Sequence, residues 1–267
     1  MYPFILSFDK INKVYDIQSH YPYGHPFSNT DDVNFLKEAN QQFLLWTKKK
    51  NILAELVKIH PLVNINNIYP GKIIFNKKML YIDLKDELIK NYSKGRKSDV
   101  KKSIKNSNIF ATNNASQKNL DIFINMYNFT MKNLNASNFY LFDKNIIAKY
   151  LKNNAHLWIA YYNQTPLASA ITIYDNDSKI VEYFLAAKYL DANKYKMPSF
   201  LIHKIASFYK SRNFIKLFLG GGTRSDENDT LYKFKKNFTK NDVDFSLGHR
   251  IFNKEKYEQL KKKYPNK

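Results

Sequence analysis

The sequence predicts an α/β (α+β) fold, in which helices flank a mixed sheet and the chain forms two halves. The 267 residues are 44% hydrophobic and 16% aromatic, enough for an ample buried core. From residue 121 onward, helical and strand-like patterns follow the order α-α-β-β-β-α-β-α-β-α. The polar stretch 113–117 precedes this region, so we expect domains at 1–115 and 116–267.

The first half begins with short apolar runs and turn residues. Tyrosines, prolines and a glycine at 21–26 predict a rigid loop. Asp31 and Asp32 can cap a helix that runs to about residue 50. Residues 52–59 and 73–84 are expected to form strands.

The segment 94–105 is the densest basic stretch and is expected to be helical. Lys97 and Lys101 lie on one stripe of this helix with Lys105, whereas Val100 and Ile104 are expected to face inward. Lysines four residues apart repel one another, which favours contact with a phosphate-bearing substrate or a tRNA backbone. An exposed charged face explains the same pattern equally well.

The second half contains helices, then three successive strands, then a further helix. The expected ranges are 120–134 and 143–153 for the helices, 156–162, 166–174 and 179–187 for the strands, and 198–212 for the last helix.

The stretch 215–257 carries the strongest local pattern. A buried strand at 215–219 runs into three consecutive glycines, which indicate a tight turn or a ligand-facing loop. A polar loop at 223–229 precedes a helix at 230–238 with Leu231, Phe234 and Phe238 on one face. A strand at 243–252 and a closing helix complete it.

Composition restricts the chemistry. The chain has no cysteine, which excludes disulfides, thiolate catalysis and cysteine-bound metal. Its net charge of +20 attracts polyanions such as RNA, anionic lipid surfaces and diphosphate-bearing ligands, although a lysine-rich background gives the same value. With no signal-peptide pattern and no long apolar run, we expect a cytoplasmic protein, with contact at the inner face of the membrane as an alternative.

The stretch 215–257 resembles the C-terminal half of the Fem-type aminoacyltransferases and related GNAT-fold acyltransferases. The matching motifs are Leu219-Gly220-Gly221-Gly222, the pattern L-hydrophobic-x-F-K-x-x-F at 231–238, and Tyr257. The resemblance implies two GNAT-like halves, the first degenerate. The chain departs from the pattern in two places: Asn133 stands where an arginine is common, and 187–199 lacks the glycines of an acetyl-CoA pyrophosphate loop.

The resemblance implies an N-acyltransferase of bacterial surface-polysaccharide or cell-envelope biosynthesis. Its donor would be an acyl-CoA, and its acceptor the amine of an amino sugar in nucleotide- or lipid-linked form, with no metal. One alternative is a Fem-like enzyme that uses aminoacyl-tRNA. Another is a non-catalytic basic RNA-binding protein, although no RRM, KH or OB signature appears and the basic residues are not interleaved with an aromatic platform.

Two side chains are the catalytic candidates. The resemblance places Lys235 at the family's FK lysine, which holds substrate phosphate or the reacting carbonyl; a solvated lysine is the alternative. Glu182, on the third strand, is a candidate base, unless its carboxylate points outward. Because no Ser-His-Asp pattern or nucleophile elbow is present, direct attack in a ternary complex is expected.

Other residues are candidates for binding the substrate or donor. Those after the strand at 215–219 would line the cleft, those in the loop at 21–26 would face it, and Ser199 would begin a helix with free N–H groups for an anion. The full set is Gly220, Gly221, Gly222, Thr223, Arg224, Phe234, Tyr23, His25, Lys97, Lys101 and Ser199.

Overall fold

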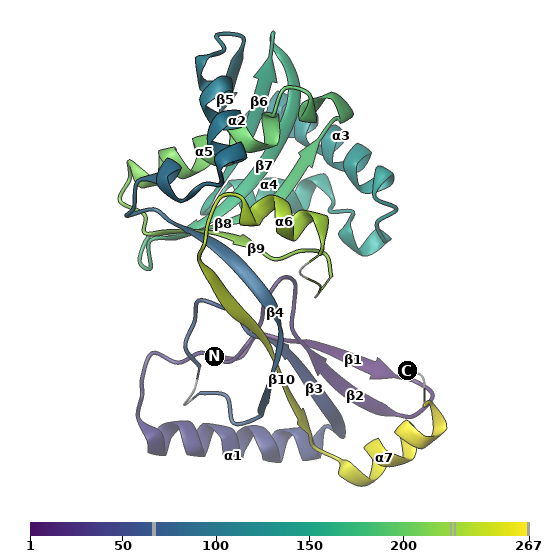
Figure 1. Cartoon of the computed structure of the whole chain (residues 1–267). Coiled ribbons are helices and arrows are strands. Elements are labelled where there is room, and N and C mark those ends of the chain that lie inside the picture. Colours follow the sequence, from purple (N-terminus) through teal and green to yellow (C-terminus); the bar gives the residue numbers. More distant parts are fainter. Residues whose placement is uncertain (66–67, 225, 227, 266–267) are drawn as a thin grey trace. The chain divides into compact units, whose positions relative to one another are not determined.

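The computed structural model describes residues 1–65, 68–224, 226 and 228–265. The chain divides into two compact units (Figure 1): unit 1 comprises Met1–Lys78 and Val243–Lys267, and unit 2 comprises Met79–Asp242. The boundary expected after residue 115 falls inside unit 2, because the basic helix before it packs with the second half of the chain. Positions 225 and 227 of the expected polar loop lie outside the described residues.

Unit 1 combines strands that are distant in sequence. Its elements are β1 (Ile5–Asp9), β2 (Val14–Gln18), α1 (Val33–Lys49), β3 (Ile52–Lys58), the first part of β4 (Lys72–Asp83), β10 (Asp242–Ile251) and α7 (Lys254–Lys263). β1 and β2 pair antiparallel, β2 and β3 pair parallel, and β3 pairs antiparallel with β10. The predicted cap is confirmed, since the Asp32 side chain accepts hydrogen bonds from the N–H groups of Asn34 and Phe35.

Unit 2 contains the predicted run of helices and strands. Its elements are the last part of β4, α2 (Lys94–Lys105), β5 (Ile109–Thr112), α3 (Gln117–Asn133), α4 (Lys144–Leu151), β6 (Ala155–Tyr162), β7 (Thr165–Asp175), β8 (Ile180–Lys188), α5 (Met197–Lys210), β9 (Lys216–Gly220) and α6 (Thr230–Lys236). The strand order in this unit is β4-β9-β8-β7-β6-β5. The mixed sheet flanked by helices is therefore as the sequence predicted.

The sheet opens between β8 and β9. These strands run parallel and pair only from Ile180–Lys216 to Glu182–Phe218. Beyond Glu182, β8 stays with β7 as far as Lys188, whereas β9 pairs with β4 up to Gly220. The splayed sheet expected from the order of elements is thus confirmed.

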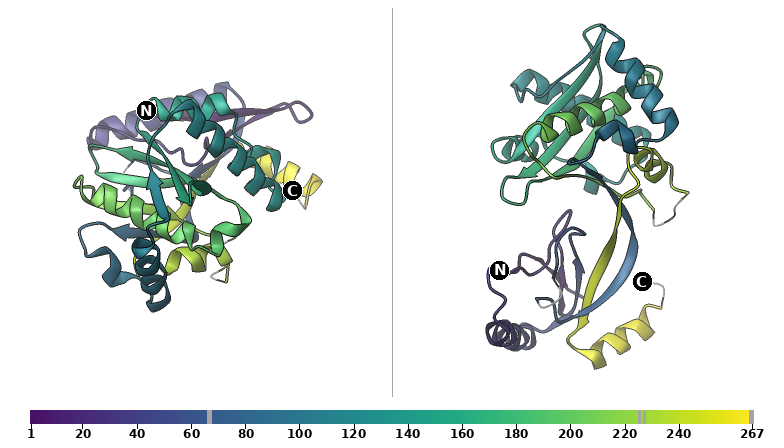
Figure 2. Two further views of the ribbon diagram at one scale, coloured as in Figure 1. Left: turned by 90° about the horizontal axis from the view of Figure 1, so that it is seen from above. Right: turned by 60° about the vertical axis from the view of Figure 1, so that its left-hand side comes forward.

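The alternation of side chains along β6 and β7 gives each face of the sheet its own core. Trp158 and Ala170 pack with α2 and α5, while Leu157 and Ile171 pack with α3 and α4 on the other face. Figure 2 shows unit 2 from two further directions, with the sheet between these helices. Both faces are buried, which explains the continuous apolar runs in these strands.

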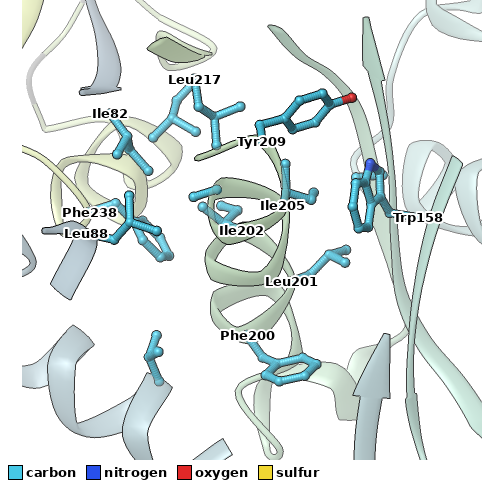
Figure 3. Close-up of a cluster of buried hydrophobic side chains, with 14 of the residues drawn as sticks. Ile82, Leu88, Trp158, Phe200, Leu201, Ile202, Ile205, Tyr209, Leu217 and Phe238 are labelled. Carbon is cyan, nitrogen blue, oxygen red and sulfur yellow. The ribbon is translucent and has the colours of Figure 1, made fainter. Parts of the chain in front are cut away.

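The core beneath α5 is almost fully closed to solvent. Leu201, Ile202 and Ile205 are each 0% exposed, and Figure 3 shows them between the sheet and Phe238 of the segment after α6. Polar groups in this core are paired: Trp158 Nε1 donates to Thr172 Oγ1 at 3.0 Å, and Thr172 Oγ1 lies 2.8 Å from the Tyr209 hydroxyl.

Some local expectations were wrong. Val100 is buried as expected, but Ile104 is 46% exposed because it lies in the last turn of α2, and Leu231 is 39% exposed at the first turn of α6. The strands β1, β2 and β5 were not predicted, since each is only four or five residues long.

Within the described residues, no helix is both long and apolar enough to span a membrane.

We expect Ile205→Ala to lower the free energy of unfolding by about 2–5 kcal/mol, because it leaves a cavity in a closed core. Leu190→Ala, which truncates a side chain that is 74% exposed in the same unit, should change it little. Urea unfolding of both variants measures the difference; equal effects would contradict the described core.

Candidate functional site

Glu182 lies on β8 at the last residue pair before β8 and β9 separate. Burial raises the pKa of its carboxyl group to about 7, while the nearby Lys235 ammonium acts to lower it. A carboxylate with this pKa is half ionised near neutral pH and can both accept and return a proton.

Lys235 reaches the same region from α6. It is only 8% exposed, and its ammonium group donates to the carbonyl oxygen of Gly221 at 2.8 Å. Gly220 has φ of +71°, a conformation that favours glycine, and a β-carbon there would lie 3.7 Å from Lys235 Nζ. The glycine turn therefore positions the ammonium group, and Lys235 is not the solvated lysine of the alternative interpretation.

Asp229 fixes the loop between the glycines and α6. Its buried carboxylate accepts hydrogen bonds from the N–H groups of Thr223 and Arg224 and from the Thr223 hydroxyl, and it caps α6 by accepting from Tyr232 N–H. A side chain at Gly222 would collide with this carboxylate, at 2.3 Å from Oδ1. Burial acts to raise the pKa of Asp229, but these hydrogen bonds outweigh it and lower the pKa to about 2.

A buried arginine lies at the start of α5. Arg96 extends from α2, donates to the Ser199 hydroxyl in the first turn of α5, and is 9% exposed. Its guanidinium carbon lies 4.7 Å from the ring centre of Phe234 and 4.6 Å from that of Phe238. Through these contacts Arg96 joins α2, α5 and the α6 segment that carries Lys235.

The charge of Arg96 is only partly compensated. Asp99 lies 3.5 Å from Nη1, and the buried Nε has no hydrogen-bond partner within the described residues. Burial lowers the pKa of the guanidinium, which Asp99 partly offsets. Because a helix N-terminus also carries positive potential, an anion bound there would be stabilised by both groups.

Comparison with solved structures identifies the fold. FemX superimposes with a TM-score of 0.72 at 10% identity, covering 96% of this chain and 86% of FemX. The chain has the fold of FemX. The C-terminal domain of a putative lysylphosphatidylglycerol synthetase from Agrobacterium fabrum gives a TM-score of 0.64 at 13% identity, with 98% of this chain and 88% of that chain covered. L-PGS from Bacillus licheniformis gives 0.65 at 10% identity, with coverage of 97% and 87%.

The sequence gives no further match. No protein-family model and no curated protein matches it. At these low identities the likeness to FemX establishes the fold alone.

On this FemX-like fold, several predicted residues come together in unit 2. Lys235 donates to Gly221 and lies in the electrostatic range of Glu182, the residue at which β8 and β9 separate. Gly220 ends β9, and Gly222 and Thr223 adjoin Asp229. Phe234 and Ser199 both contact Arg96: the guanidinium group packs over the Phe234 ring and donates to the Ser199 hydroxyl. The side chain of Arg224 is instead 71% exposed and faces Asp226 at 3.8 Å. On α2, Lys97 is half-buried and Lys101 is exposed.

The two candidates from the first half belong to unit 1. Tyr23 packs against His60 and Phe245, with ring centres 4.8 and 5.9 Å apart, and His25 Nδ1 lies 2.9 Å from the Pro26 carbonyl oxygen. Burial, with a smaller contribution from His25, lowers the pKa of His60 to about 4. Their role in binding stays a prediction.

Sequence reasoning missed Arg96 and Asp229. Arg96 was placed within the basic segment, but it lies one position before the lysine stripe, on the buried face of α2. The signal that could have found Asp229 is its position directly before a helix, where aspartate is a favoured N-cap.

We expect Asp229→Asn to lower the free energy of unfolding by about 2 kcal/mol at pH 7, since the ionised carboxylate is stabilised only in the folded state. The folded pKa of about 2 lies below the ordinary value of 3.8, so the effect should be complete above about pH 4 and vanish as pH falls through 2. Chemical unfolding at several pH values measures this. Asp177→Asn, at an exposed turn, is the matched control; a pH-independent difference would contradict the assignment.

Proposed function

We propose that the protein transfers an acyl or aminoacyl group to an amine, with Glu182 as the base and Lys235 as the group that stabilises the carbonyl oxygen. The observation that carries this proposal is the half-buried Glu182 side chain, whose carboxyl pKa is raised by desolvation to about 7. It lies in the electrostatic range of the buried Lys235 ammonium group, at the residue where β8 and β9 separate. The fold shared with FemX supports the same reaction class.

In the proposed reaction, the acceptor amine attacks the donor carbonyl carbon. A C–N bond forms and the carbonyl oxygen becomes an oxyanion, which the Lys235 ammonium stabilises. Glu182 takes a proton from the attacking nitrogen. When the tetrahedral intermediate collapses, the bond to the leaving group breaks with its electron pair, and the leaving oxygen or sulfur receives the proton from Glu182.

The donor would place a phosphate group at the start of α5. Ser199, the first N–H groups of α5 and the buried Arg96 guanidinium together favour an anion there. Both candidate donors, an acyl-CoA and an aminoacyl-tRNA, carry phosphate. If the donor is an acyl-CoA, we propose that the acceptor is the amine of a nucleotide- or lipid-linked amino sugar.

Two observations favour the aminoacyl-tRNA donor. The segment before α5 has no glycine to bring backbone N–H groups around a pyrophosphate, and the net charge of +20 suits a long polyanion. We keep this as the second candidate function.

We expect Glu182→Gln to reduce kcat by roughly 10²–10⁴-fold, because the amide cannot accept the proton. In the parent enzyme kcat/KM should rise with pH through about 7, as Glu182 loses its proton. Steady-state rates across pH test both, with the exposed Glu87→Gln as the control. A fully active Glu182→Gln variant would remove Glu182 from the mechanism.

Lys235→Ala should lower kcat by roughly 10²-fold, through loss of oxyanion stabilisation. It should also move the pH–rate rise to higher pH, because the ammonium group lowers the pKa of Glu182. Lys233→Ala on the exposed side of α6 should do neither. If both lysine variants behave alike, Lys235 is not at the reacting centre.

The donor can be identified by thermal stability with coenzyme A, acetyl-CoA or deacylated bulk tRNA, each at two salt concentrations. A ligand that binds the native state raises the unfolding midpoint. Stabilisation by the coenzymes supports the acyl-CoA donor, and salt-sensitive stabilisation by tRNA supports the second candidate. Binding of tRNA without any aminoacyl transfer would instead favour a non-catalytic RNA-binding protein.

A further inference from the structure

Unit 1 contains a pocket of about 860 Å³, although neither Glu182 nor Lys235 belongs to this unit. It lies among the C-terminal part of α1, the start of β4 and the junction of β10 and α7, which Figure 1 labels. Leu44, Ile52, Pro70 and Phe252 contribute its apolar wall. The volume falls within the roughly 300–1,000 Å³ that is usual for small-molecule sites.

The charge around this pocket is strongly positive. Lys48 on α1, Lys72 on β4 and Lys254 on α7 line it from three separate elements, whereas Glu255 is the acidic residue of the lining. Within the described part of the chain, none of these three ammonium groups has an ion-pair partner. Three such charges around one pocket repel each other, and a multiply charged anion would relieve that repulsion.

One arginine of the pocket lining is held in place by several contacts. Arg250 lines the pocket and is held by Glu55, which accepts from its Nε, and by Asn40, which accepts from Nη1 at 2.7 Å. The guanidinium carbon also lies 5.0 Å from the ring centre of Phe43 and 5.1 Å from that of Phe252. The site thus combines one arginine held by several contacts with three exposed lysines around it.

We propose that this pocket binds a small diphosphate ester of nucleotide size. The three lysines would contact the phosphate oxygens, and the apolar wall would contact the carbon-bearing part of the ligand. A concave pocket with an apolar wall fits a compact ligand better than a polymer, whose backbone is usually bound along an extended basic groove. This site is independent of the proposed transfer reaction, so its ligand is detected by binding alone.

The test is calorimetric titration of the full chain with inorganic pyrophosphate, ADP and UDP at fixed ionic strength. The pocket variant Lys48→Gln/Lys72→Gln/Lys254→Gln should weaken binding by about ten-fold, since each exposed contact adds a modest amount. The control Lys49→Gln/Lys50→Gln/Lys261→Gln removes the same charge from exposed lysines outside the lining and should leave affinity nearly unchanged. Circular dichroism verifies that both variants fold.

Hydrogen–deuterium exchange locates the bound ligand. Protection of 44–52, 70–72 and 249–255 by the nucleotides is expected. Protection confined to the first turns of α5 would place the ligand at the proposed donor site and overturn this proposal, as would equal weakening in both variants or no binding at all. Binding of bulk tRNA but not of the nucleotides, lost in the pocket variant, would overturn it in favour of RNA.

Discussion

The separation of β8 from β9 after Glu182 is the constraint on which the site of unit 2 depends. Beyond this point the two parallel strands no longer pair through backbone hydrogen bonds, and each pairs with its other neighbour. Glu182 lies at this point and is half-buried, and desolvation raises the pKa of its carboxyl group. The sheet topology thus sets the surroundings in which the pKa of Glu182 is raised.

Around this opening, short-range interactions hold a second charged group in place. The glycine turn after β9 returns the chain toward the sheet, and Asp229 ties that turn to the first turn of α6 through four hydrogen bonds. α6 then carries Lys235 inward to the Gly221 carbonyl group. Arg96 secures the same helix from α2 by packing against Phe234 and Phe238. The glycine turn, the Asp229 cap and the buried Arg96 guanidinium group together hold the Lys235 ammonium group in place.

Much of the fold could be predicted from local sequence signals. The strands β6 to β8 are continuous apolar runs broken by turn residues, and Asp32 is a strong helix cap, so each was found from its own residues. The short strands β1, β2 and β5 carry too few residues for such a pattern, and they form because they pair with longer neighbours. The inward face predicted for Ile104 was wrong because helix periodicity does not show where the neighbouring elements end.

The sequence by itself determined the class of fold, the order of its elements, and the types of group that could act: a strand glutamate, a lysine after the glycines, and an excess of positive charge. Only the tertiary structure decided which of these groups meet. Glu182 and Lys235 are 53 residues apart in the chain, and Arg96 reaches Ser199 across 103 residues. Such encounters depend on strand order and helix packing, which bring distant residues together and exclude water, and no local pattern encodes them. The same holds for the pocket of unit 1, whose lysines come from α1, β4 and α7.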